Sequence, residues 1–500
     1  MTAATALPIA RRFLAEASRT PVNVLTLVLV PVVFVVVAAG PMADAAELLG
    51  GPGGPAVQTA TAGWAAGFIA AVAMYFQMRA ARAADRRLVL GGLAPSRLVA
   101  ARMATGLTLA LMAAAAALVA LQLRTGISDP VRVAAGTLMF AVIYLAIGAL
   151  IGATVSNPVN GTVLVLFVWI LDVFFGPAIG AADRPVTRIL PTHFVTLWMI
   201  DLPSHHAGRI SDLGWALTWT AVAIAVGWTV ITVTSRTAAR PRHRTSPGSA
   251  ADQIAAGVGM GLRETGRNHV LWVLLAAVPV VFVLLAVATT PKESTSLTVR
   301  EQGRILSQQV WLPDVHGGTM APIAIASLAT LAGLFTVLDA RSADQRLALA
   351  GFRTGSLLVC RLAVVTLLAL LATAASLAVT ATVFDARQWG LYIAASVLIA
   401  LTYALIGVLI GPLFGRVGGV LIAFLLPFLD IGIEQSPMLH PQPPAWAHAL
   451  PGYGPGRVLI DAAITPTFDE LGALLLALGW LAALTAAAAV MFHRTATAAR

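Results

Sequence analysis

Two arginine-rich stretches separate apolar segments of this chain. The first, Arg79 to Arg102, reads RAARAADRRLVLGGLAPSRLVAAR, and the second, Asp339 to Arg361, reads DARSADQRLALAGFRTGSLLVCR. The two align without a gap, so that Asp85 coincides with Asp344. Charged side chains are costly in the hydrocarbon core of a bilayer. Both stretches are therefore predicted to lie on one face of a membrane, exposed to the adjoining water.

Composition places the chain among membrane proteins. Of its 500 residues, 58% are hydrophobic and only 11% are charged, whereas an average soluble protein carries about a quarter charged residues. Apolar runs of about twenty residues, the length of a membrane-spanning helix, recur along the chain. We expect an all-α polytopic protein with twelve transmembrane helices, at 22–40, 60–78, 103–123, 133–153, 160–175, 213–234, 270–289, 319–338, 357–383, 389–411, 418–433 and 470–492.

The net charge of +10 comes almost entirely from arginine. With the amino terminus inside, the cytoplasmic segments hold 22 of the 32 basic residues but only 6 of the 22 acidic residues. This is the distribution that the positive-inside rule describes, so both termini are predicted to be cytoplasmic. The charge pattern thus follows membrane topology and gives no reason to expect a nucleic-acid partner.

The chain contains an internal repeat. The motif Tyr-x-x-x-Gly-x-x-x-Gly occurs at 144–152 and again at 403–411, and Asp172 recurs as Asp430. Repeats in the same order and orientation predict two parallel halves of six helices each. The predicted organisation is a first half, a flexible cytoplasmic linker and a second half, at 1–234, 235–251 and 252–500.

The fifth span of each half is unusually short. The apolar run before Asp172 or Asp430 covers only about a dozen residues, too few for an ordinary spanning helix. The stretches that follow, 176–211 and 434–468, are predicted to dip back into the outer leaflet. Acids within a membrane are functional suspects, so the two aspartates are candidates for an outer gate. Their shared place at the outer ends of short helices favours a structural role.

An amphipathic segment precedes the first span of each half. These segments, 5–20 and 252–268, are predicted to lie as helices in the membrane interface. Their charged residues are Arg12, Glu16, Arg19, Glu264 and Arg267.

The sequence lacks a phosphate-binding loop. Such a loop needs a lysine on the phosphates, and the only lysine, Lys292, stands in a predicted outer loop. ATP could therefore drive this protein only through a separate polypeptide. The single cysteine, Cys360, excludes an internal disulfide. Several histidines and aspartates cluster in the sequence, but none has the spacing that would place two metal ligands on one helix face. They are therefore expected in a solvated loop rather than around a metal. These residues are His193, Asp201, His205, His206 and Asp212.

The sequence Asp85-Arg-Arg-Leu-Val-Leu-Gly-Gly-Leu-Ala-Pro95-Ser-Arg resembles the cytoplasmic loop of ABC-2-type transporter permeases. In that family the loop runs from an acid and a basic residue through Gly-Thr-Leu and Glu to Pro-x-Ser, and it ends in a basic residue. The resemblance also includes the interfacial helix, the short fifth span and the outer re-entrant stretch. It therefore covers essentially the whole chain, with one copy in each half. Val89 stands where the family has Glu, and the second copy has Arg353-Thr-Gly-Ser in place of Pro-x-Ser. The chain is similar to fused two-half permeases of the antibiotic-efflux, tetronasin-resistance type.

This resemblance implies the permease subunit of an exporter in a bacterial cytoplasmic membrane, with a type V exporter-like fold and no ATPase site of its own. Two copies of a separate ATPase, carrying ATP and Mg²⁺, would dock on the arginine-rich stretches. They would drive a hydrophobic or amphiphilic compound outward along the interface between the halves. The docking residues would be Arg82, Asp85, Arg86, Arg87, Arg341, Asp344 and Arg346. The substrate path would be lined by Pro31, Phe34, Tyr75, Phe167, Pro279, Phe282, Phe335 and Phe424.

Two other classes of protein fit parts of the sequence. A proton-coupled major-facilitator carrier also has twelve spans in parallel halves. It would carry a Gly-x-x-x-Asp-Arg-x-Gly-Arg-Arg loop and acids in mid-span, whereas the residues around Asp85 lack the flanking glycines. A membrane-embedded enzyme would need convergent His, Asp or Ser inside the bilayer, and the predicted spans contain almost none. The carrier is therefore the alternative to the exporter subunit.

Overall fold

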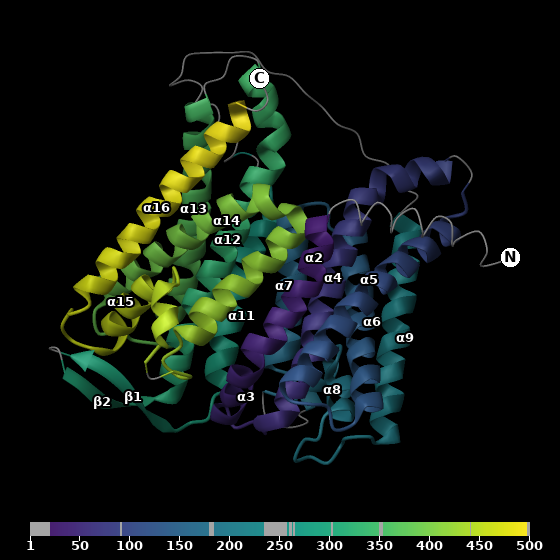
Figure 1. Ribbon diagram of the computed structural model, residues 1–500, viewed down its shortest axis with the longest axis horizontal. Coiled ribbons are helices and arrows are strands. Elements are labelled where there is room, and N and C mark those ends of the chain that lie inside the picture. Colours follow the sequence, from purple (N-terminus) through teal and green to yellow (C-terminus); the bar gives the residue numbers. More distant parts are fainter. Residues whose placement is uncertain are drawn as a thin grey trace. The chain divides into compact units, whose positions relative to one another are not determined.

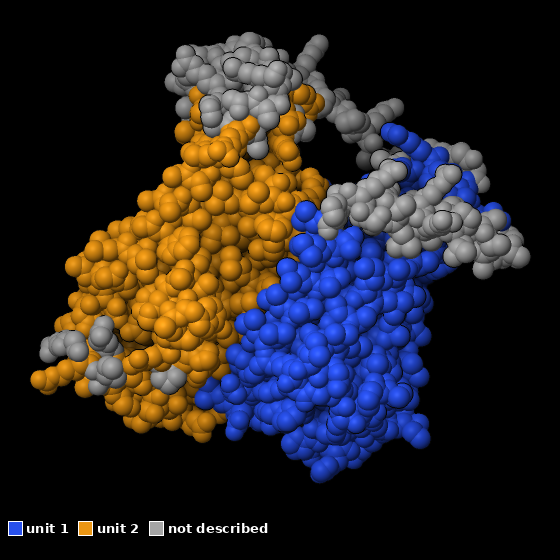
Figure 2. Space-filling view, viewed as in Figure 1, with its two compact units in different colours: residues 1–241 blue, residues 242–500 orange. Residues whose placement is uncertain are grey.

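Ten helices in the described part of the chain are long and apolar enough to cross a membrane. The computed structural model describes residues 21–500 except 91–92, 180–184, 235–257, 260–262, 264–265, 302–303, 350–353, 441 and 498–500. The chain divides into two compact units, Met1–Pro241 and Arg242–Arg500, coloured separately in Figure 2. The boundary falls inside the predicted linker, which lies outside the described residues. The protein is a predominantly helical, multi-pass membrane protein.

Unit 1 is a bundle around one long buried helix, α4 (Figure 1). Its helices are α2 (Pro21–Val33), α3 (Ala39–Leu48), α4 (Gly54–Leu90), α5 (Pro95–Arg124), α6 (Pro130–Thr154), α7 (Pro158–Phe174), α8 (His193–Met199) and α9 (Ile210–Thr234). In the apolar stretch of α4, 94% of the residues are buried inside the structure, against 17% in that of α9. α4 packs most extensively on α6. The two helices approach so closely at Gly148 that a side chain there would overlap the backbone of Ala71. Small residues of this kind let two helices approach closely in a membrane.

Unit 2 has the same order of long helices. They are α11 (His269–Thr289), α12 (Leu312–Leu349), α13 (Thr354–Thr380), α14 (Trp389–Pro427), α15 (Tyr453–Ile464) and α16 (Leu471–Thr497). Its most extensive contact joins α12 and α14, where a side chain on Gly407 would overlap the backbone of Thr330. Gly148 and Gly407 occupy equivalent places in the repeated Tyr-x-x-x-Gly motif. The repeated glycine thus serves close helix packing in each unit.

The two short fifth spans account for the difference between twelve expected spans and ten observed candidates. The expected span 160–175 is α7, an apolar helix of only 17 residues. The expected span 418–433 follows the span 389–411 without a loop, because only Gly415, whose backbone is non-helical, separates the two helices of α14, and the second helix runs into a π-helix, Phe428–Glu434. Gly415 has a φ of 67°, a conformation that glycine adopts without strain. Gly415 therefore divides α14 into two helices.

A β-hairpin replaces the outer loop expected before α12. Strand β1 (Ser294–Glu301) pairs in antiparallel register with β2 (Arg304–Trp311). Leu297 and Val299 alternate with polar residues, and they pack against Val315 of α12 and Ile464 of α15. This alternation with period two is a strand signal, but it covers too few residues to stand out between two long apolar segments.

Candidate functional site

The arginine-rich stretches are helical extensions rather than loops. α4 continues three turns past its expected end and stops at Leu90, and α12 stops at Leu349. Alanine, arginine and leucine favour helices, and no glycine or proline interrupts these residues. α5 then begins at Pro95, a residue preorganised for the first helical turn. The hinge expected between apolar helices is therefore mostly helix, and it is confined to the few residues between α4 and α5.

A buried ion pair joins the end of α4 to the start of α5. Arg102 donates from Nη2 to Oδ1 of Asp85 at 2.7 Å and from Nε to Oδ2 at 3.2 Å. The two side chains are 8% and 9% exposed. Two parallel bonds between a guanidinium and a carboxylate fix orientation as well as distance. Burial raises the pKa of Asp85, and the bond and charge of Arg102 only partly oppose this shift.

The second unit contains the equivalent pair with the same geometry. Arg361 donates from Nη2 to Oδ1 of Asp344 at 2.7 Å and from Nε to Oδ2 at 3.2 Å. These side chains are 13% and 12% exposed. We call the two pairs the Asp–Arg clamps. Asp85 and Asp344 were predicted to face an ATPase, but the clamps hold both carboxylates inside their own units.

Two arginines of α4 close the end of α6 in unit 1. Arg82, which is half-buried, donates from Nε to the carbonyl of Gly152 at 3.0 Å and from Nη2 to that of Val155 at 3.0 Å. Arg79 donates to the carbonyl of Ser156 at 3.1 Å. The last carbonyls of a helix lack partners within the helix, so these arginines cap α6. Arg82 was predicted for docking, and the structure places it in this cap.

Three of the predicted docking residues are exposed to solvent: Arg87 near the end of α4, and Arg341 and Arg346 near the end of α12. The side chain of Arg86 lies outside the described residues, as do Arg12, Glu16, Arg19 and Glu264 of the predicted interfacial helices. Arg267 is exposed immediately before α11. Among the described side chains, fewer of the predicted docking residues are thus exposed than the sequence suggested.

Asp172 anchors the stretch after α7. Its carboxylate is 4% exposed. It accepts hydrogen bonds from the Tyr144 hydroxyl at 2.7 Å, the Thr192 hydroxyl at 2.5 Å and the Thr192 N–H at 3.3 Å. Tyr144 belongs to α6, and Thr192 precedes α8. One carboxylate thus ties three segments of unit 1 together.

Asp430 has the same place in unit 2. It is 1% exposed and accepts from the Tyr403 hydroxyl at 2.5 Å, the Gly452 N–H at 2.7 Å and Gln435 Nε2 at 3.3 Å. These bonds supply the structural role that the sequence favoured for both aspartates, and a gating role stays a prediction. The sequence alone predicts no hydrogen-bond partner for either acid. The repeated tyrosine of the Tyr-x-x-x-Gly motif was the available signal.

The residues predicted to line a substrate path are mostly buried in the packing of their own unit. Tyr75 is 0% exposed, and its hydroxyl donates to the carbonyls of Asn157 at 3.1 Å and Pro158 at 3.3 Å. Phe167 is half-buried. The remaining predicted path residues, all buried, are Pro31, Phe34, Pro279, Phe282, Phe335 and Phe424. Pro31 precedes a π-helix, Phe34–Ala38, which carries the backbone distortion of this span.

The histidine-containing segment of unit 1 between α8 and α9 makes polar side-chain contacts. His206 Nδ1 lies 2.9 Å from Asp212 Oδ2, and Arg132 lies 3.1 Å from Asp201. No group of three or more His, Cys, Asp or Glu residues that could hold a metal ion occurs among the described residues.

The clamps and the carboxylate anchors are the functional candidates that the geometry offers. Neither a protein-family model nor a curated protein sequence matches the chain.

Proposed function

We propose that this chain is the membrane-spanning subunit of an ABC-2-type exporter, built from two parallel six-helix halves and powered by a separate ATPase. The observation that carries the proposal is the pair of Asp–Arg clamps. In each unit a helix extends beyond its apolar span and is locked to the next helix by a buried bidentate bond. Exposed arginines stand on these extensions, Arg87 on α4 and Arg341 and Arg346 on α12.

A locked extension suits a protein that is moved from outside the membrane. Force applied to a flexible loop would be lost in bending the loop. Force applied beside a clamp moves both helices joined by it, because separating them would break a buried ion pair. With the positive-inside orientation expected from the sequence, the clamps face the cytoplasm, where ATP is available.

The carboxylate anchors support the same proposal at the opposite ends of the helices. Asp172 and Asp430 hold the segments that follow the short fifth helices, so these segments move with α6 and α14. The spans are apolar and offer few charged groups, which suits a hydrophobic or amphiphilic compound. A substrate of this kind would be released toward the outer leaflet.

Charge reversal of the exposed arginines tests the proposal. In Arg87→Glu with Arg346→Glu, co-purification with the proposed ATPase partner should fall sharply, because a like-charged group at a desolvated contact costs about 2–5 kcal/mol. Membrane insertion should be unchanged, since both residues lie beyond the apolar spans. Arg304→Glu, an exposed position on β2, is the matched control.

Two further results would decide the class. The purified chain alone should show no ATP hydrolysis, because it lacks a phosphate-binding loop. Full complex formation and full transport by the double variant would contradict the docking proposal. Transport that follows a proton gradient and needs no ATPase would favour the carrier alternative instead.

A further inference from the structure

Three acidic residues lie where α15 joins α16 in unit 2. Asp461 is near the end of α15, and Asp469 and Glu470 come just before α16. Arg457 of α15 donates to Oε1 of Glu470 from Nη2 at 2.6 Å and from Nε at 3.2 Å. This pair neutralises one of the three carboxylates. Neither Asp461 nor Asp469 has an ion pair within the described part of the chain.

The two unpaired carboxylates are shielded from solvent. Asp461 is 5% exposed; its Oδ1 accepts from the Thr465 hydroxyl at 2.7 Å, whereas its Oδ2 is buried and accepts no hydrogen bond. Both carboxylate oxygens of Asp469 are buried and also have no hydrogen-bond partner. Burial raises the pKa of Asp461, the Thr465 hydroxyl and the Asp469 N–H partly lower it, and the charges of Asp469 and Glu470 raise it further. The two aspartates are therefore close enough to repel each other.

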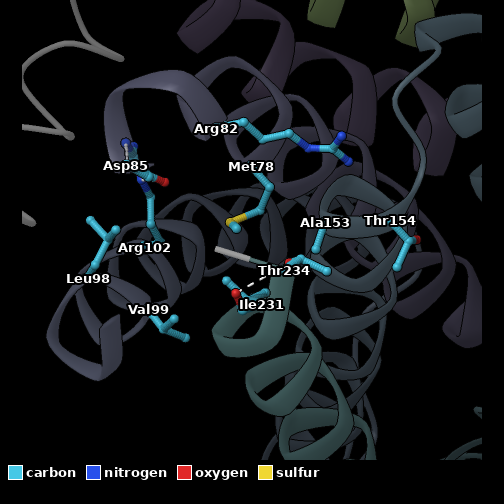
Figure 3. A pocket seen from close by; sticks show the side chains of 10 residues that line it. All are labelled: Met78, Arg82, Asp85, Leu98, Val99, Arg102, Ala153, Thr154, Ile231 and Thr234. Carbon is cyan, nitrogen blue, oxygen red and sulfur yellow. Dashed lines mark hydrogen bonds and ion pairs between the residues drawn. The ribbon is translucent and has the colours of Figure 1, made fainter. Parts of the chain in front are cut away.

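Other buried acids of this protein have their partners in place. Asp85 lies beside Arg102 of the clamp (Figure 3). Asp172 and Asp430 each accept three hydrogen bonds from surrounding groups. Buried carboxylates in proteins are ordinarily paired or coordinate a metal ion. Adjoining carboxylates whose buried oxygens lack partners therefore suit a bound cation.

Unit 1 matches the equivalent acid with an arginine. Asp201 corresponds to Asp461, because each stands at the same distance after a repeated Leu-Pro pair. Arg132 of α6 binds Asp201 at 3.1 Å. Counting back from the repeated Tyr-x-x-x-Gly motif places Leu391 of α14 opposite Arg132. The acid is thus repeated in unit 2 but its arginine is not, so a cation from solution would have to take the place of the guanidinium.

We propose that Asp461 and Asp469 bind a calcium ion, which ties the end of α15 to the start of α16. Ca²⁺ takes carboxylate oxygens together with backbone carbonyls and waters, and carbonyls of the segment between the two helices can complete its shell. Such a site uses two acidic side chains, so it differs from the groups of three or more that the described residues lack. With the orientation expected from the sequence, the site faces the exterior. It requires nothing of the ATPase or of transport and stands apart from the proposed function.

Thermal unfolding of the purified full chain, first in EGTA and then with CaCl₂, tests the site. Ca²⁺ should raise the unfolding temperature, because a ligand that binds only the folded state stabilises it. Its half-maximal effect should fall at about 0.1–1 mM, as in extracellular calcium modules. NaCl at the same ionic strength should have no such effect. Asp461→Asn and Asp469→Asn should each weaken the apparent affinity for Ca²⁺ about tenfold or more, because this affinity depends on the number of charged ligands.

Stability in EGTA separates loss of the ion from loss of the fold. Without Ca²⁺, both variants should be at least as stable as the unaltered chain, because each removes a buried charge that has no partner. Glu293→Gln is the matched control, since it neutralises an exposed acid immediately before β1. It should respond to Ca²⁺ as the unaltered chain does. If one aspartate variant fails to fold, the other decides with this control.

Three results would overturn the proposal. Absence of any Ca²⁺ effect would show that the two aspartates are neutralised in another way, such as by a shared proton. An equal effect of NaCl at matched ionic strength would show general screening of acidic groups rather than a bound ion. An undiminished response to Ca²⁺ in Asp461→Asn and Asp469→Asn would place the ion elsewhere.

Discussion

The arginine-bearing ends of the two units share one feature and differ in another. Both contain an Asp–Arg clamp with bonds of 2.7 and 3.2 Å. In unit 1 the chain then breaks between α6 and α7, where the Asn157 side chain accepts from the N–H groups that begin α7. In unit 2 the equivalent interruption is the single non-helical residue Gly415, which joins the two helices of α14 without a loop. The clamp is common to both units, whereas the interruption between the next two helices is a short loop in unit 1 and a one-residue kink in unit 2.

This difference changes what the arginines do. The break in unit 1 releases helix carbonyls, and Arg79 and Arg82 bond to them. In unit 2 the interruption covers only Gly415, and Arg341, the counterpart of Arg82, is exposed. Arg416 beyond the kink pairs with Asp339 at 2.5 Å. Equivalent arginines thus stabilise a helix end in one unit and face solvent in the other.

Breaking a clamp should have the largest effect. Arg102→Gln leaves the carboxylate of Asp85 buried without its cation, which costs about 3–5 kcal/mol of folding free energy. Arg361→Gln should act in the same direction and somewhat less, because its pair is more exposed, at 13% and 12% against 8% and 9%. Thermal unfolding of the purified chain measures both.

The double variant Asp85→Asn with Arg102→Gln controls for the buried charge. It removes both charges together and should recover part of the stability lost by Arg102→Gln. Arg87→Gln, at an exposed residue, should change stability little. An Arg102→Gln protein as stable as the Arg87→Gln protein would show that the clamp contributes nothing.

The sequence predicted the clamps' positions but not their bonds. The gap-free alignment placed Asp85 on Asp344 and Arg102 on Arg361, and polarity correctly put all four near one end of the spans. Positive residues in loops are expected from topology alone, so the acids were interpreted as surface residues. Their burial depends on α4 and α12 continuing as helices, which brings residues 17 positions apart into contact. Long-range packing of this kind is not visible in hydropathy.

Removing the tyrosine of a carboxylate anchor should have the next largest effect. Tyr144→Phe and Tyr403→Phe each delete one hydrogen bond to a buried carboxylate, which costs about 1–3 kcal/mol. Because Asp172 and Asp430 have similar partners, the two losses should agree closely, unlike changes at the arginine-bearing ends. Thermal unfolding measures both, and a large loss in only one unit would contradict the similarity.

The kink in α14 should be sensitive to a single methyl group. Gly415→Ala places an L-residue at a φ of 67° and a ψ of -162°, a region essentially confined to glycine, which costs about 1–3 kcal/mol. A Cβ there would meet no atom within 4 Å, so the loss comes from the backbone alone. Gly214→Ala, in the helical part of α9 with equally open surroundings, is the matched control and should be neutral or slightly stabilising. Equal stability of the two variants would show that the kink is not held at Gly415.

The smallest expected effect is the pH dependence of the clamp in unit 1. Burial raises the pKa of Asp85 above its usual 3.8, although the hydrogen bond and the charge of Arg102 partly lower it again. The folded protein therefore holds this proton more tightly than the unfolded chain does. The stability that Asp85 contributes is fully present below the unfolded pKa of 3.8 and is lost as the pH rises through the raised pKa.

The unfolding temperature, followed upward from about pH 4, should fall more steeply in the unaltered protein than in Asp85→Asn. Arg102→Gln removes the group that lowers this pKa, so the loss should extend to higher pH. An Asp85→Asn protein with an unchanged pH profile would show that this carboxylate keeps its ordinary pKa and that the ion pair fully offsets its burial.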